Sequence, residues 1–177
     1  LDLLDKYNVK VTFFVTNTHP DYQNLIAEEA KRGHTVAIHS ASHKYDQIYT
    51  SEQAFFDDLE QMNSIIKAQT GNDASIIRFP GGSSNTVSKD YCPGIMTQLV
   101  NDVTARGLLY CDWNVSSGDA NNKPISTEQV VQNVISGVQS HNVSVVLQHD
   151  IKDFSVNAVE QIIQWGQANG YTFLPLT

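Results

Sequence analysis

The stretch VKVTFFVTNTHPDYQNLIAEEAKRGHTVAIHS, residues 9–40, holds two short apolar runs with a helical pattern between them. Its ends, VKVTFFV (9–15) and TVAIHS (35–40), are rich in β-branched and aromatic residues, as in strands buried on both faces of a sheet. Between them, apolar residues recur at helical spacing over about residues 20–32, and Gly33 stands where a helix end favours glycine. The stretch therefore predicts a strand, a crossover helix and a second, parallel strand.

The same alternation continues to the end of the chain. Further helices are predicted over residues 51–69, 94–106, 127–139 and 156–168. Further strands are predicted at SIIRF (75–79), LLYCDWNV (108–115), VSVVLQHD (143–150) and YTFLPL (171–176). This order indicates an α/β fold with a parallel sheet, and a closed or nearly closed barrel is favoured over a doubly wound open sheet. In both folds, the functional residues lie at the carboxyl ends of the strands.

Size and charge narrow the class of protein. The 177 residues contain no linker-like stretch, so we expect a single domain. The net charge of -8 and the lack of a basic cluster argue against a nucleic-acid partner. No apolar run approaches the roughly 18 residues of a membrane span. The two cysteines, Cys92 and Cys111, are either one disulfide or two free thiols, and free thiols are favoured.

Side chains that could bind a ligand or take part in catalysis lie at or after the ends of four predicted strands: His39 and His43, Arg78, Trp113 with Asp119, and His149 with Asp150. His39 and His43 form the motif HSASH, and two imidazoles four residues apart can chelate one divalent ion, although a pair of surface histidines has the same spacing. Arg78 opens RFPGGSSN, which is either a ligand-binding turn or a plain turn with an anchored arginine. His149 is a candidate general acid or a hydrogen-bonded core histidine. Together these motifs predict one rim of functional residues.

In this order, HSASH, RFPGGSSN, WNVSSGD and LQHD resemble the NodB-homology polysaccharide deacetylases, carbohydrate esterase family four. The resemblance runs essentially end to end and is closest to bacterial deacetylases that act on N-acetylglucosamine of the cell wall. It implies an irregular, partly open (β/α) barrel. It also implies a metal-dependent hydrolase that removes N-acetyl groups from sugar polymers, with peptidoglycan ahead of chitin.

The same resemblance implies a role for each motif residue. His39 and His43 would be two of three protein ligands of one divalent metal, with zinc ahead of cobalt, nickel or manganese. Arg78 would orient the catalytic base, and His149 would be the general acid, tuned by Asp119. Four further residues would shape the substrate groove, hold the oxyanion or line the acetyl pocket: Pro80, Gly81, Trp113 and Leu147.

The family's first motif, Thr-Phe-Asp-Asp, supplies the third metal ligand and the base, and this chain does not contain it. The adjacent pair Asp57 and Asp58 is not a substitute, because the helical pattern places Phe55, Phe56 and Leu59 in the core and the acids toward solvent. Either the chain is a fragment that lacks its first strand or it is a natural variant. The fragment is favoured, and alone it is expected to bind metal weakly and to lack deacetylase activity.

Two alternative functions remain open at this point. The first is an O-deacetylase, such as an acetylxylan esterase, with the same catalytic groups. The second is a carbohydrate-binding module that keeps the groove without turnover. In each case the partner is an acetylated polysaccharide, so we expect an extracellular or wall-associated monomer whose export signal lies outside this chain.

Overall fold

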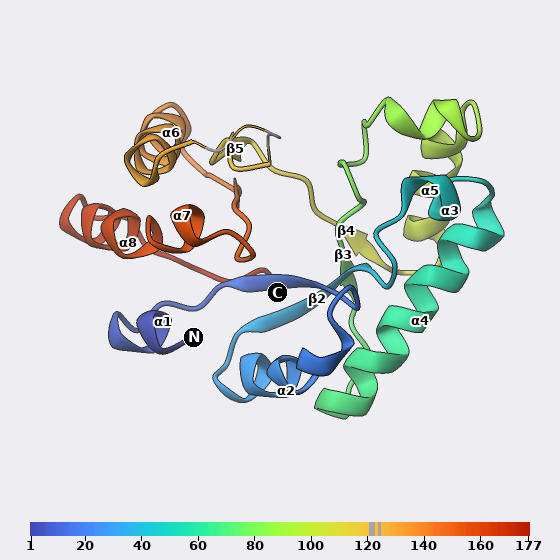
Figure 1. Ribbon diagram of the computed structural model, residues 1–177, viewed down its shortest axis with the longest axis horizontal. Coiled ribbons are helices and arrows are strands. Elements are labelled where there is room, and N and C mark those ends of the chain that lie inside the picture. The colour runs from blue at the N-terminus through green and yellow to red at the C-terminus, as the bar shows by residue number, and fades with distance from the viewer. Residues whose placement is uncertain (121–122, 124) are drawn as a thin grey trace. The chain divides into compact units, whose positions relative to one another are not determined.

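The computed structural model describes residues 1–120, 123 and 125–177 as helices joined by short parallel strands (Figure 1). The chain forms two compact units. Unit 1 comprises Leu1–Asp112 with Leu174–Thr177, and unit 2 comprises Trp113–Phe173. In the described part of the chain, no helix is both long and apolar enough to cross a membrane.

Unit 1 contains a four-stranded sheet in which all neighbouring strands are parallel. The strand order is β1-β2-β3-β4. The strands are β1 (Thr12–Thr16), β2 (Thr35–Ser40), β3 (Ile76–Ile77) and β4 (Leu109–Tyr110). Phe14 pairs with Ala37, and the register shifts after Val15, so that Thr16 pairs with Ser40. The parallel strands that the sequence predicts at residues 9–40 are confirmed.

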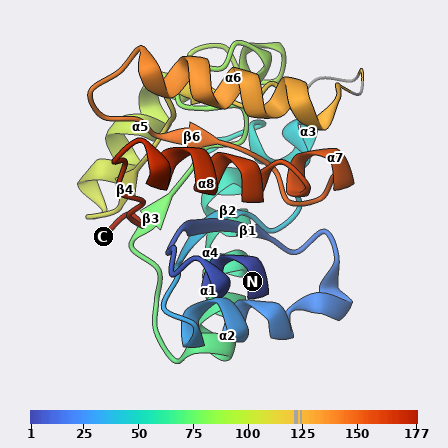
Figure 2. The ribbon, with the colours of Figure 1, turned by 90° about the vertical axis from the view of Figure 1, so that its left-hand side faces the viewer.

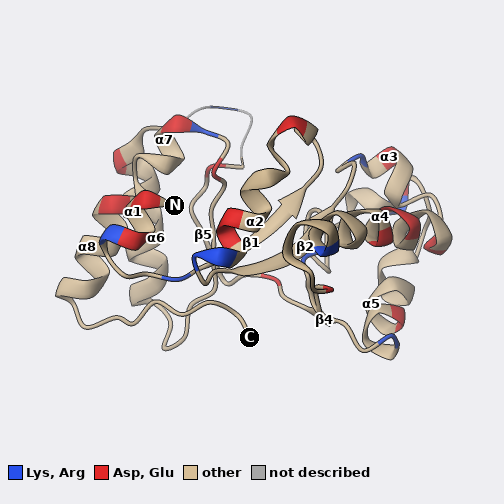
Figure 3. Cartoon of the chain, turned by 90° about the horizontal axis from the view of Figure 1, so that it is seen from below, with Lys and Arg blue, Asp and Glu red and all other residues tan. Residues whose placement is uncertain are grey.

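Helices join and cover these strands. They are α1 (Asp2–Lys6), α2 (Asn24–Lys31), α3 (Tyr45–Ile48), α4 (Glu52–Thr70) and α5 (Ile95–Ala105), with 3-10 turns η1 (Pro20–Tyr22) and η2 (Val87–Asp90). The long helix α4 begins at the N-cap Ser51, whose hydroxyl accepts the amide of Ala54, and ends at Gly71 with a φ of 80°. Acidic residues outnumber basic ones along this helix (Figure 3).

The core of unit 1 lies between α4, α5 and the sheet. The face of α4 that the sequence predicts as apolar is buried there, since Phe55, Phe56, Leu59, Met62 and Ile66 are at most 7% exposed. Burying side chains of this size stabilises a fold by roughly 1.5–3 kcal/mol each. This core makes α4 a rigid support for strand β2, against which it packs.

Unit 2 is a smaller α/β structure. Its strands β5 (Val115–Ser116) and β6 (Val146–Leu147) are parallel, and Ser116 pairs with Leu147. Its helices are α6 (Thr127–Gln139), α7 (Asp153–Val156) and α8 (Val159–Ala168), and α6 packs against α8 (Figure 2). The core of this unit is formed mainly by Val130, Val131, Val134, Ala158 and Ile162.

The structure corrects the prediction that LLYCDWNV is one strand. The segment divides into β4 in one sheet and β5 in the other. The carbonyls of Cys111 and Asp112, between the two strands, accept hydrogen bonds from the Arg78 guanidinium instead of continuing a ladder. Local apolar character cannot predict such a break, because the donor comes from a residue distant in sequence.

The prediction that YTFLPL is a strand is also wrong, since residues 171–176 do not form a strand. Its backbone is held by side chains instead. Thr12 Oγ1 accepts the amide of Leu176 at 2.8 Å, and Thr35 Oγ1 donates to the Leu176 carbonyl at 2.6 Å. Likewise, β1 is half-buried along its length rather than buried on both faces.

The α/β class with parallel strands and the irregular, partly open form of the barrel are confirmed, since the strands of the described residues form two separate sheets and no closed barrel. The lack of a closed barrel follows from the short strands, because β3, β4, β5 and β6 have two residues each and form few hydrogen bonds to neighbouring strands. Cys92 and Cys111 are both free thiols, as the sequence favoured.

Candidate active site

The site residues that the sequence predicts fall into two groups, each within one unit. His39, His43, Arg78, Pro80 and Gly81 belong to unit 1. The residues in unit 2 are Trp113, Asp119, Leu147 and His149.

His39 and His43 lie side by side at the carboxyl end of β2. Their ring centroids are 4.9 Å apart with an interplanar angle of 50°. Nδ1 of His39 lies 2.7 Å from the carbonyl oxygen of Arg78. Because a carbonyl only accepts, Nδ1 carries the proton, and Nε2 keeps the lone pair in the neutral ring. This is the arrangement in which metal-ligating histidines are oriented.

His43 occupies an unusual backbone conformation, with a φ of 55°. The left-handed region costs a non-glycine residue roughly 1–2 kcal/mol, so the surrounding structure must stabilise it. The His43 amide donates to Ser40 Oγ at 2.8 Å, and its ring lies 5.7 Å from the ring of Tyr45 at the start of α3. The turn thereby directs both imidazoles to the same end of the sheet.

The two imidazoles suit a zinc-like ion as part of its ligand set. Neutral histidine is a usual ligand for such metals, and catalytic zinc sites have three protein ligands. Among the described residues, no group of three or more His, Cys, Asp or Glu side chains is placed to hold an ion. The described residues therefore fit two positions of such a site and provide no third protein ligand beside them.

Arg78 is a structural anchor at the end of β3. It is 7% exposed, and its guanidinium donates from Nε to the Cys111 carbonyl at 2.8 Å and to the Asp112 carbonyl at 3.1 Å. It also lies 4.0 Å from the ring centroid of Phe14, a cation–π contact. Burial lowers the pKa of Arg78 from its usual value, yet a guanidinium remains charged near neutral pH. Arg78 thus combines a buried cation, bound to the carbonyls of Cys111 and Asp112, with a backbone carbonyl that orients His39.

The turn that follows, residues 79–85, is held from two sides. The hydroxyl of buried Tyr49 donates to the Pro80 carbonyl at 2.7 Å, and the Ser83 amide donates to Asp112 at 2.9 Å. Gly81 is exposed and has a φ of 79°. A Cβ at this position would lie 2.9 Å from the Tyr45 hydroxyl, so only glycine fits. Pro80 is buried and acts by shaping the backbone.

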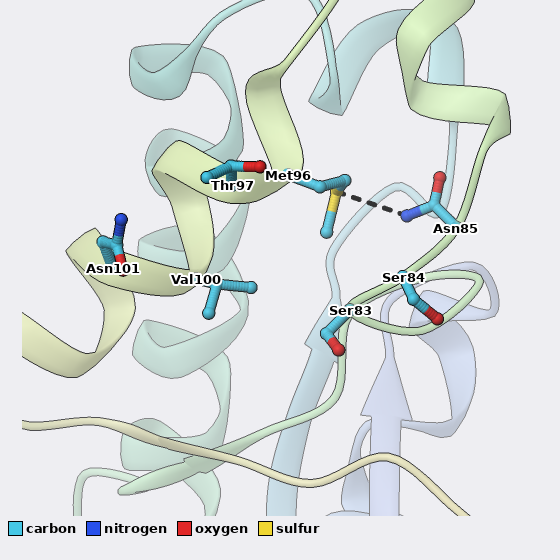
Figure 4. A pocket seen from close by; sticks show the side chains of 7 residues that line it. All are labelled: Ser83, Ser84, Asn85, Met96, Thr97, Val100 and Asn101. Atoms are coloured by element: carbon cyan, nitrogen blue, oxygen red, sulfur yellow. Dashed lines mark hydrogen bonds between the residues drawn. The ribbon is translucent and has the colours of Figure 1, made fainter.

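A pocket of about 450 Å³ lies between this turn and α5 (Figure 4). Ser83, Ser84 and Asn85 line one side of it, and residues of α5 line the other: Met96, Thr97, Val100 and Asn101. Asn85 is fixed by a hydrogen bond from its amide nitrogen to the sulfur of Met96 at 3.2 Å. The lining holds no titratable side chain, so the pocket can supply hydrogen bonds and shape but no acid or base.

In unit 2, a buried carboxylate orients a half-exposed histidine. Asp119 is 2% exposed, and its Oδ1 lies 2.8 Å from Nδ1 of His149. Its Oδ2 accepts the His149 amide at 2.7 Å and the Ser155 hydroxyl at 2.6 Å. The backbone carbonyl of Asp119 accepts a hydrogen bond from Lys152. With Nδ1 bonded to the carboxylate, Nε2 is the nitrogen of His149 through which a proton is exchanged.

Burial alone would raise the pKa of Asp119, but the hydrogen bonds from His149, Ser155 and Ser117 outweigh it and hold that pKa well below its usual range. Asp119 is therefore ionised at neutral pH. An ionised acceptor fixes the ring of His149, because a carboxylate can only accept.

Trp113 and Leu147 are both half-buried. Leu147 is the last residue of β6, two residues before His149, and it pairs with Ser116. These positions leave part of each apolar side chain accessible, as a role in lining an apolar wall requires.

We expect Asp119→Asn to lower the free energy of unfolding by roughly 2–4 kcal/mol at neutral pH, because a buried charged network is broken. Since folding lowers the pKa of Asp119, its contribution is present above the unfolded pKa of about 3.9 and is lost as pH falls below that value. The difference between wild type and variant should shrink on acidification, measured by urea denaturation across this range. Asp150→Asn, at an exposed neighbouring position, is the control. A difference independent of pH would contradict the assignment.

Sequence reasoning missed several residues that hold the site. Ser155, Lys152 and Tyr49 contact motif residues but have no signal in the local pattern. The prediction that both acids of Asp57 and Asp58 face solvent is right for Asp57 and wrong for Asp58, whose carboxylate binds the turn between His39 and His43. The serines in HSASH were the available signal for a buried acceptor, because short hydroxyl residues in a turn need hydrogen-bond partners.

The known proteins that this chain resembles include polysaccharide deacetylases. A family model described as polysaccharide deacetylase matches residues 1–92. The chain is 28% identical over 178 residues to a peptidoglycan-N-acetylglucosamine deacetylase of Bacillus cereus, and the match covers 98% of this chain but 62% of that protein. It is 29% identical over 181 residues to a bifunctional xylanase/deacetylase of Pseudobutyrivibrio xylanivorans, 27% of which is covered.

Solved structures give the same result. The catalytic domain of peptidoglycan N-acetylglucosamine deacetylase from Eubacterium rectale is 96% identical with a TM-score of 0.99, and the match covers 99% of this chain and 80% of that one. A polysaccharide deacetylase of Bacillus cereus is 27% identical with a TM-score of 0.85, with 99% and 83% covered. Because the family model matches 92 of the 177 residues, the chain belongs to the polysaccharide deacetylase family.

Proposed function

We propose that this chain is the larger part of a metal-dependent hydrolase that removes N-acetyl groups from N-acetylglucosamine polymers, with peptidoglycan ahead of chitin. Relatives named as peptidoglycan N-acetylglucosamine deacetylases support the substrate class. The observation that carries the chemistry is the hydrogen bond between Asp119 and His149, which prepares an imidazole for proton transfer.

In this proposal His149 is the general acid. An amide has a poor leaving group, so its hydrolysis requires that the departing nitrogen be protonated. Asp119 holds Nδ1 of His149, and Ser155 and Lys152 hold Asp119 in turn. The ring is thus oriented before substrate binds, which lowers the cost of reaching the reactive geometry.

His39 and His43 are the proposed metal ligands, and zinc is preferred over cobalt, nickel or manganese. A bound ion would polarise the acetyl carbonyl and activate water. We propose that the third ligand and the catalytic base are the acids of a Thr-Phe-Asp-Asp motif, which residues 1–177 do not contain. The carbonyl of Arg78 keeps His39 in the tautomer that binds metal through Nε2.

The other motif residues shape the binding groove. The amide of Gly81, an exposed residue, is proposed to donate to the developing oxyanion. Pro80 fixes the course of this turn, and Arg78 orients the base. Trp113 and Leu147 would provide the apolar wall for the acetyl methyl group.

For the whole protein we propose one deacetylase domain that includes residues 1–177 and a preceding strand. The polymers named above lie outside the cytoplasm, so we propose an extracellular or wall-associated monomer. The acetylated polysaccharide is its partner.

The test is release of acetate by a chain that also carries the Thr-Phe-Asp-Asp segment. We expect release from peptidoglycan that a chelator abolishes and zinc restores. Parallel assays on chitin oligomers and acetylxylan separate the substrates, and the xylanase/deacetylase relative makes acetylxylan a necessary arm. Binding to these polymers without acetate release would support a carbohydrate-binding module and overturn the proposal.

A further inference from the structure

Asp58 lies on α4, far in sequence from the site motifs, yet its carboxylate binds the turn between the two candidate ligands. Oδ2 accepts the Ser40 hydroxyl at 2.6 Å and the Ala41 amide at 2.9 Å, and Oδ1 accepts the Ser42 amide at 2.8 Å. Three donors from three consecutive residues thus converge on one carboxylate. Hydrogen bonds to a charged acceptor are stronger than neutral ones.

The contact continues from Asp58 to His43. Ser40 Oγ donates to Asp58, and the same oxygen accepts the His43 amide at 2.8 Å. His43 needs this support because of its left-handed φ of 55°. The carboxylate therefore sets the course of the whole turn from Ser40 to His43.

The helix that carries Asp58 is a rigid support. Its neighbours Phe55, Leu59 and Met62 are buried in the core, at 4%, 7% and 0% exposed. The position of the carboxylate is consequently fixed by core packing rather than by the turn itself. Asp57, one residue earlier, is exposed and accepts a hydrogen bond only from Gln53 on the same helix among the contacts described.

We propose that Asp58 is a positioning residue that holds the turn between His39 and His43 in the shape required to bind one metal ion. The inference rests on the proposed role of the two histidines as ligands. In this role Asp58 would not be a metal ligand, because its carboxylate is bound to Ser40, Ala41 and Ser42. It acts through the backbone of Ala41 and Ser42 and through the Ser40 hydroxyl.

The test compares Asp58→Asn with Asp57→Asn in this chain, with Zn²⁺ alone as the probe. Asparagine offers one acceptor oxygen to three donors and points an NH₂ group at one of the backbone amides, so the turn loses its clamp. We expect the zinc dissociation constant of Asp58→Asn to rise about 10–100-fold, the range typical of residues that support metal ligands, while Asp57→Asn stays within about twofold of wild type.

A second readout needs no metal. Amide hydrogen exchange at Ala41, Ser42 and His43 should accelerate in metal-free Asp58→Asn and stay unchanged in Asp57→Asn, because the three amides lose their acceptors directly or through Ser40. Asp58→Glu keeps both oxygens and should recover part of the zinc affinity. Ser40→Ala, which cuts the link to His43 and leaves α4 intact, should weaken zinc binding if Asp58→Asn fails to fold.

Unchanged zinc affinity in folded Asp58→Asn, or equal weakening in Asp57→Asn, would overturn the inference. So would a wild-type chain that does not bind Zn²⁺. If these variants behave as expected but the longer chain releases no acetate, only the proposed function fails.

Discussion

Replacing His39 with alanine is expected to abolish zinc-dependent deacetylation in a chain that carries the Thr-Phe-Asp-Asp segment. The imidazole is one of three proposed protein ligands, and the Arg78 carbonyl at 2.7 Å orients it. Metal assistance contributes several kcal/mol to transition-state stabilisation, and each 1.36 kcal/mol is a factor of ten in rate. We therefore expect a loss of roughly 10³-fold or more in kcat/KM, measured as acetate release.

Zinc affinity provides a second, independent measurement of the loss of the His39 ligand. The variant should bind zinc far more weakly than wild type in a calorimetric titration, and His43→Ala should behave alike. His19→Ala is the matched control, because His19 is exposed and belongs to none of the motifs. Full zinc affinity in His39→Ala would show that the pair of His39 and His43 is not the metal site.

Replacing His149 with alanine is expected to lower kcat by about 10²–10⁴-fold, the usual contribution of general acid–base catalysis. Zinc affinity should be unchanged, because His149 donates no ligand in the proposed mechanism. Loss of rate with metal binding intact would separate the acid from the ligands.

The leaving group provides a sharper test of the acid. A nitrophenyl acetate releases a stable anion that needs no proton, whereas an N-acetyl sugar releases an amine that does. His149→Ala should therefore lose much less activity on the aryl ester than on the amide. His141→Ala, an exposed histidine of unit 2, is the control for nonspecific effects. Equal losses on both substrates would contradict the role of general acid.

The helices were the most predictable part of the structure. Residues 127–139 form α6 as the sequence predicts, and the caps Ser51 and Gly71 bound α4. Helices follow from local rules, since capping and periodic burial depend on residues within a few positions of each other. Strand bounds were less predictable, as LLYCDWNV and YTFLPL show, because ladders depend on distant partners.

The sequence by itself determined the alternation of strands and helices, except at LLYCDWNV and YTFLPL, and it determined the motifs HSASH, RFPGGSSN, WNVSSGD and LQHD at or near strand ends. Only the tertiary structure decided which groups hold those motifs in shape. The Asp58 carboxylate accepts a hydrogen bond from the HSASH turn, Arg78 donates to the Cys111 carbonyl directly after β4, and Ser155 donates to Asp119. Each of these contacts joins residues at least 16 positions apart in the sequence. Such partners are invisible to local pattern, because hydrogen bonds between distant side chains form only once core packing has placed the elements that carry them.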